Sequence, residues 1–186
     1  KDVCAYLTYH AKKAEPISPL NQKPTINAAI APLEVVIENP EACARYSGIL
    51  IEGVKVGPSP TWLKNKLQAI GSRSINNIVD ITNFILHATG QPLHAFDAAK
   101  IQGKKIVVKK CLQDSLFTTL DEKERKLTAQ DLMICDTEKP MCIAGVFGGL
   151  DSGVRATTTS IFLESAWFEN VHIRKTSVHH GLRTDA

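Results

Sequence analysis

The sequence predicts an α+β fold in which mixed sheets pack against a few helices. Three observations lead to this prediction. Alternating apolar and polar residues begin at residue 33, two segments of helical periodicity occupy the middle of the chain, and the second half is rich in strand patterns. Because helices and strands are segregated along the chain, α+β is favoured over an alternating α/β arrangement.

The first 32 residues are predicted to connect to the globular part rather than to belong to it. Residues 1–13 have a helical pattern, and residues 14–32 hold four of the nine prolines, which is typical of an extended segment. A chain that begins Lys-Asp, without methionine, is expected to be a fragment or a processed form. We therefore divide the chain into a connecting segment, 1–32, and one compact unit, 33–186, helical in its first half and β-rich in its second.

Two helices are expected in the centre of the compact unit. The first starts at Pro60 and ends at Gly71. The second has Ser74 as its expected N-cap and stops at Gly90. His94 then falls in the turn after the second helix, just before a strand, where loops meet a sheet and binding residues are common.

Most of the remaining chain has strand patterns. Strands or hairpins are expected over 33–39, 45–57, 94–101, 104–111, 115–128, 132–149 and 159–168, followed by a short helix over 169–181. The lysine-rich strand 104–111 is interpreted as an edge strand protected by charge or, alternatively, as a phosphate-facing patch.

Composition excludes several classes of protein. The net charge of +3 is too small to indicate a nucleic-acid binder, and no apolar run approaches the roughly 20 residues of a membrane span. Five cysteines at irregular spacing, without zinc-ligand patterns, indicate reduced thiols. Cys135 and Cys142 could face each other across a hairpin or could be two buried apolar side chains. No GxGxxG, GxxxxGK or GxSxG pattern marks a phosphate loop or a serine nucleophile.

Two residues are candidates for chemistry. Glu164 interrupts the apolar strand IFLESAWF, and alternation puts it on the same face as Phe162. If Phe162 points inward, Glu164 does too, and a buried carboxylate needs a hydrogen-bonding partner, such as a ligand. An exposed edge position agrees equally well with the periodicity. For His94, a structural role and a binding role both remain open.

Several segments together resemble the B3/B4 region of the bacterial phenylalanyl-tRNA synthetase β subunit. They are SRSINNIVDITNFILHATGQPLHAFD, FGGLDSGV, FLESAWF and HHGLRTDA, in this order, and the resemblance covers residues 33–186. It implies a three-layer B3/B4-type domain that hydrolyses misacylated tyrosyl-tRNA(Phe). It further implies a cytoplasmic enzyme that pairs this β subunit with an α subunit as (αβ)2 and joins phenylalanine to tRNA(Phe) using ATP and Mg2+. No cofactor or metal is expected in this fragment.

The resemblance also implies roles for individual residues. His94 would lie at the amino-acid ester as the catalytic group, and Glu164 would receive the tyrosine para-hydroxyl as a charged acceptor that phenylalanine leaves unpaired. The other expected substrate-binding residues are Pro92, Asn83, Arg73, Gly148, Gly149, Thr184 and Ala186. Water would attack the ester, oriented by His94 or by a ribose hydroxyl, and backbone N–H groups near the two glycines could stabilise the oxyanion.

Two alternatives remain. The same fold could serve as a non-hydrolytic tRNA-docking or subunit-interaction module, or the chain could act on a free small molecule. The intact GQPLHAFD and FLE motifs favour hydrolysis over docking, and the chain has no cofactor fingerprint to support the second alternative.

Overall fold

The computed structural model describes residues 2–11, 25–27 and 32–184. Contacts divide the chain into two compact units, Lys1–Ala31 and Pro32–Ala186. The first unit contains helix α1 (Asp2–His10), within the segment predicted to be helical. Most of the expected proline-rich connection lies outside the described residues. The second unit has the predicted α+β fold, with helices and several sheets.

A five-stranded sheet forms one layer of the second unit. Its order is β1 (Glu34–Ile37), β4 (Lys105–Lys110), β7 (Leu132–Cys135), β8 (Pro140–Ile143) and β9 (Phe147–Gly148). Strands β1 and β4 are parallel, and the other neighbours are antiparallel. The prediction of a charge-protected edge strand is wrong, because β4 lies between β1 and β7. Its first lysine, Lys105, instead forms an ion pair with Glu34 at 3.0 Å.

Alternation along this sheet sorts its side chains into two cores. One core contains Ile106, Val108, Ile134 and Cys142, and the other contains Val107, Met133, Cys135 and Ile143. Strand β7 is consequently buried on both faces, which explains its continuous apolar sequence. Cys135 and Cys142 do not face each other across the hairpin, since they point into different cores. The interpretation as buried apolar side chains is the one that the structure supports.

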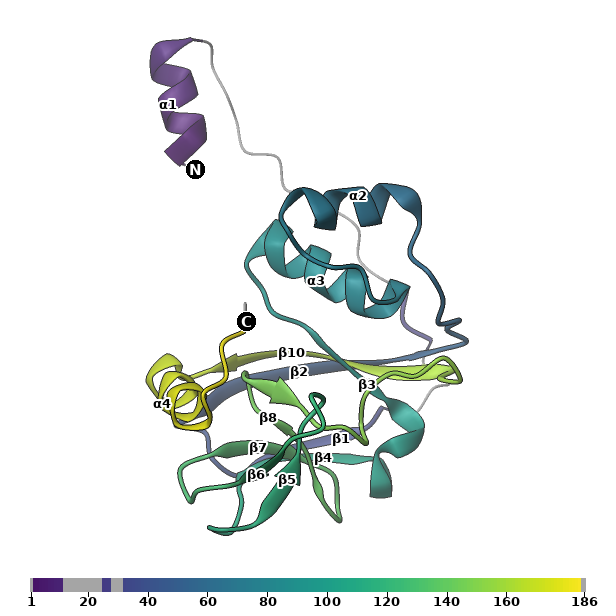
Figure 1. Cartoon of the computed structure of the whole chain (residues 1–186), viewed down its shortest axis with the longest axis vertical. Coiled ribbons are helices and arrows are strands. Elements are labelled where there is room, and N and C mark those ends of the chain that lie inside the picture. Colours follow the sequence, from purple (N-terminus) through teal and green to yellow (C-terminus); the bar gives the residue numbers. More distant parts are fainter. Residues whose placement is uncertain (1, 12–24, 28–31, 185–186) are drawn as a thin grey trace. The chain divides into compact units, whose positions relative to one another are not determined.

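A three-stranded antiparallel sheet packs against the first core. Its order is β2 (Cys43–Glu52), β10 (Ser160–Phe168) and β3 (His94–Asp97). Phe96 and Phe162 join the apolar residues of the five-stranded sheet in that core. In the view of Figure 1, helices α2 (Thr61–Ala69) and α3 (Asn77–Thr89) lie on the other side of this sheet, so helices and sheets form layers.

The smaller elements complete the unit. Strands β5 (Leu116–Thr118) and β6 (Glu124–Lys126) form the first predicted hairpin. Short 3-10 turns η1 (Ala98–Lys100) and η2 (Gln102–Lys104) follow β3, and helix α4 (Asn170–His180) follows β10. None of the helices in the described ranges is long and apolar enough to cross a membrane.

The N-cap of helix α3 lies two residues after the predicted one, Ser74. Asn76 is the cap, and its side chain accepts a hydrogen bond from the Val79 amide at 3.0 Å. The hydroxyl of Ser74 instead donates to Asp80, a fully buried carboxylate that also accepts from Ser59 and from the Ile75 amide. These bonds fasten the segment before α3 to the helix, which ends as predicted at Gly90 in a left-handed conformation.

Candidate active site

Glu164 and His94 are direct neighbours across two strands. In the register of the three-stranded sheet, Glu164 on β10 lies opposite His94 on β3 and opposite Gly48 on β2. Directly opposed residues place their side chains on the same face of a sheet. The carboxyl and the imidazole therefore share the face that carries Phe162 and Phe96 into the core between the two sheets.

Glu164 points inward, in the orientation that alternation offers if Phe162 is buried. The exposed fractions are 5% for Glu164 and 2% for Phe162. The Tyr46 hydroxyl donates a hydrogen bond to Glu164 Oε2 at 3.2 Å. Burial raises the pKa of Glu164 to about 8, even though the Tyr46 hydrogen bond lowers it. At neutral pH the carboxyl is therefore mainly the neutral acid and not the charged acceptor expected from the sequence.

His94 presents a buried nitrogen without a partner. It is the first residue of β3, where the strand expected over 94–101 begins, and its ring packs edge-on against Phe96 with centroids 4.5 Å apart. Within the described residues, His94 Nε2 has no hydrogen bond. Burial lowers the pKa of His94 to about 4, so the ring is neutral at neutral pH. An unpaired buried nitrogen of this kind is a ready contact for water or a ligand.

Gly148 brings the five-stranded sheet against this histidine. A Cβ at Gly148 would lie 3.0 Å from His94 Cε1 and 2.8 Å from Leu120 Cδ1, so a side chain would displace Leu120 and crowd the imidazole. Gly149 has a different environment. Its N–H donates to the Met141 carbonyl at 2.9 Å and is not available to an oxyanion, which makes the expectation for that amide wrong.

The other predicted residues lie on several different elements. Pro92 is half-buried in the turn before β3, where the Gln91 side chain donates to the carbonyls of Pro92 and Ala166 and so ties the turn to β10. Asn83 is half-buried on α3, Arg73 is exposed between α2 and α3, and Thr184 is exposed near the end of the described chain. Within residues 32–184, none of these three forms a hydrogen bond or ion pair with Glu164 or His94. Ala186 lies outside the described residues.

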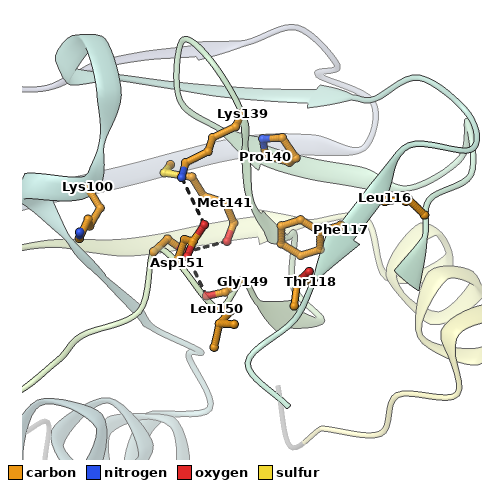
Figure 2. Close-up of a pocket in the computed structure, with 11 residues that line it drawn as sticks. Lys100, Leu116, Phe117, Thr118, Lys139, Pro140, Met141, Gly149, Leu150 and Asp151 are labelled. Carbon is orange, nitrogen blue, oxygen red and sulfur yellow. Dashed lines mark hydrogen bonds and ion pairs between the residues drawn. The ribbon is translucent and has the colours of Figure 1, made fainter. Parts of the chain in front are cut away.

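A cavity of about 350 Å³ lies beyond Gly149, lined by residues of β5, β8 and the segment 149–152. Figure 2 shows the Lys139 amino group directed at Asp151 beside it, and the two form an ion pair at 3.4 Å. Neither Glu164 nor His94 lines this cavity. We place the candidate site at the buried pair, because unpaired polar groups in the interior need a functional explanation and exposed ion pairs do not.

Tyr46 is a site residue that the sequence did not indicate. It lies opposite Ala166, two residues from Glu164, and its ring stacks on Phe162 at a centroid distance of 6.5 Å. The alternation of β2 could have placed Tyr46 on one face of a strand. Its contact with Glu164 depends on the pairing of β2 with β10, which are 118 residues apart at this point.

A carboxylic acid and a neutral imidazole, adjacent in the interior of an α+β domain, define a candidate hydrolytic or ligand-binding site. The B3/4 domain model matches residues 42–186, and the chain belongs to this family.

Similar relatives include the phenylalanine–tRNA ligase β subunits of Bacteroides thetaiotaomicron, 53% identical, and Carboxydothermus hydrogenoformans, 47% identical, each over 100% of this chain and 23% of the relative. The chain thus spans about a quarter of those relatives. A solved N-terminal fragment of the phenylalanyl-tRNA synthetase β subunit from Pyrococcus horikoshii has the same fold, with a TM-score of 0.54 at 13% identity. The match covers 80% of this chain and 49% of that one. The resemblance seen in the sequence is confirmed.

Proposed function

We propose that this chain is the proofreading part of a phenylalanine–tRNA ligase β subunit and that it hydrolyses tyrosyl-tRNA(Phe). The observation that carries the proposal is the buried pair of Glu164 and His94, a hydrogen-bonding acid beside an imidazole with an unpaired nitrogen. Membership of the B3/4 domain family and the similarity to β subunits support it. A module used only for docking does not require such a pair in its interior.

Specificity would come from Glu164. Tyrosine and phenylalanine differ by one hydroxyl, and a site built to hydrogen-bond that hydroxyl discriminates far better than an apolar pocket does. The Tyr46 contact is an internal example of a phenol bound to this carboxyl. As a neutral acid, Glu164 can donate to the phenol oxygen or accept from its O–H. A phenylalanine ring would desolvate the acid further without supplying the additional hydrogen bond that the tyrosine hydroxyl makes.

His94 would position the attacking water. A neutral Nε2 can accept a hydrogen bond from water near the ester carbonyl, but with its pKa at about 4 the ring is a weak proton acceptor at neutral pH. We therefore assign His94 mainly to orientation, with the terminal ribose hydroxyl as a second group that can orient water. Attack on the carbonyl carbon breaks the ester C–O bond and releases tyrosine and the tRNA 3′ hydroxyl.

The partners follow from the same proposal. The substrate is tRNA(Phe) carrying tyrosine, and the chain acts within an (αβ)2 ligase. The attachment of phenylalanine with ATP and Mg2+ would take place elsewhere in that enzyme.

The test is deacylation by the intact ligase carrying Glu164→Ala. We expect the preference for tyrosyl-tRNA over phenylalanyl-tRNA to fall by about 10- to 100-fold, the equivalent of one buried hydrogen bond. The matched control is Glu52→Ala, an exposed glutamate at the end of β2 in the same sheet, which should keep the wild-type preference. An unchanged preference in Glu164→Ala would refute the assigned role. An intact wild-type enzyme that leaves tyrosyl-tRNA uncleaved would support the docking alternative.

A further inference from the structure

Two cysteines outside the candidate site are in contact. Cys111 follows the end of β4 and Cys135 ends β7, and their sulfur atoms are 3.8 Å apart. Both are free thiols. Proximity of this kind is a prerequisite for a disulfide, although the S–S bond of about 2.05 Å requires the two side chains to rotate closer. The segment that follows β4 and begins with Cys111 is not part of the sheet.

The two thiols differ in accessibility and in acidity. Cys111 is half-buried, whereas Cys135 is 1% exposed. Both line a cavity of about 470 Å³, and Lys109 and Lys110 also line it. The hydrogen bond from Cys135 lowers the pKa of Cys111 to about 7, with a further contribution from the Lys109 charge, against the opposing effect of burial. The same pairing raises the pKa of Cys135. Cys111 is therefore the more accessible and the more acidic thiol of the pair, and the reactive form of cysteine is the thiolate.

We propose that Cys111 and Cys135 form a reversible disulfide when the protein meets a hydroperoxide, with Cys111 as the attacking thiol and Cys135 as the resolving thiol. The Cys111 thiolate attacks the terminal peroxide oxygen, the O–O bond breaks, and hydroxide or alkoxide leaves and takes up a proton. The resulting sulfenic acid is then attacked by the sulfur of Cys135, forming the S–S bond and releasing water. Overall, two thiols lose two hydrogens and the hydroperoxide is reduced to water and, for an organic peroxide, the alcohol.

The other core cysteines provide internal controls. Cys43 and Cys142 are buried in the core on the opposite face of the five-stranded sheet, and burial raises the pKa of each. Neither is expected to react at the rate of Cys111.

The disulfide would link the two ends of the segment that contains β5 and β6. That hairpin reaches the candidate site, because the Leu120 amide donates to the Gly148 carbonyl.

The test is peroxide treatment of the intact protein, followed by alkylation of the remaining thiols under denaturing conditions and mass spectrometry with fragmentation. We expect Cys111 and Cys135 to become joined and to lose alkylation together, about tenfold or more faster than Cys142, and to recover it after reduction with dithiothreitol. The wild-type protein alone decides the point. The proposal would be overturned if both cysteines could still be alkylated after peroxide treatment, or if Cys111 were joined to a cysteine other than Cys135.

Single substitutions then separate the two roles. Cys135→Ser should leave Cys111 as a sulfenic acid that reacts with dimedone, whereas Cys111→Ser should leave Cys135 reduced, and Cys43→Ser should form the disulfide as the wild type does. Rapid oxidation of Cys135 in Cys111→Ser would reverse the assigned order of attack and contradict the proposal. None of these readouts depends on tRNA hydrolysis, so the result is independent of the proposed function.

Discussion

The substitution Glu164→Gln tests the physical claim that this carboxyl is buried and mainly neutral. Glutamine has nearly the same shape and can still accept from the Tyr46 hydroxyl, but it does not ionise. The pKa of Glu164 is 4.5 in the unfolded chain and about 8 in the folded protein. Between these values the folded state binds the proton more tightly, so the wild type loses stability as pH rises from about 4.5 to about 8.

The size of the effect follows from that pKa difference. Full ionisation of the buried acid costs at most about 5 kcal/mol, and relaxation and water entry will reduce this to a few kcal/mol. The variant avoids this cost. Its free energy of unfolding, relative to the wild type, should therefore rise by a few kcal/mol between about pH 5 and about pH 9. The titration of His94 and of other shared groups cancels in this difference to first order.

Urea unfolding followed by circular dichroism, at several pH values, measures this difference directly. The matched control is Glu52→Gln, because Glu52 lies in the same sheet but is exposed at the end of β2, so the substitution removes no buried carboxyl. If Glu164→Gln and the wild type show parallel stability profiles from pH 5 to pH 9, the carboxyl has the same pKa in the folded and the unfolded chain, and Glu164 is not a buried neutral acid.

Three further predictions follow from the packing. Tyr46→Phe removes a hydrogen-bond donor to Glu164, so the free energy of unfolding measured in urea should fall by about 1 kcal/mol. The pKa of the Glu164 carboxyl should rise further, and an unchanged pKa in an NMR titration would contradict the contact. Gly148→Ala crowds the imidazole, so tyrosyl-tRNA hydrolysis should be lost and the free energy of unfolding should fall by about 1–3 kcal/mol. The control is Gly57→Ala, where no atom lies within 4 Å of the new methyl group. Asp80→Ala leaves three donors unpaired and should lower the free energy of unfolding by about 3 kcal/mol or more; a loss under about 1 kcal/mol would show that water replaces the carboxylate.

Local patterns were sufficient for most elements of the fold. The helical stripe and Gly90 predict where α3 ends, and alternation predicts β2, β10 and the two hairpins, because a period of 3.6 or 2 is a property of a single segment. The N-cap of α3 was misplaced, since Ser74 and Asn76 are both good caps and the choice depends on the bonds that Ser74 makes to Asp80.

Residue type and short-range spacing were enough to predict the fold class, the family resemblance and the two residues at the centre of the candidate site. The neighbours of those two residues, by contrast, depend on how distant strands pair. The register of β10 places Glu164 next to His94 and within reach of Tyr46, and burial between two sheets makes the acid neutral. The tertiary packing likewise places Cys135 and Cys142 in different cores and brings Cys135 into contact with Cys111. Contacts between distant strands, and the desolvation they impose, are set by packing and cannot be read from any one segment.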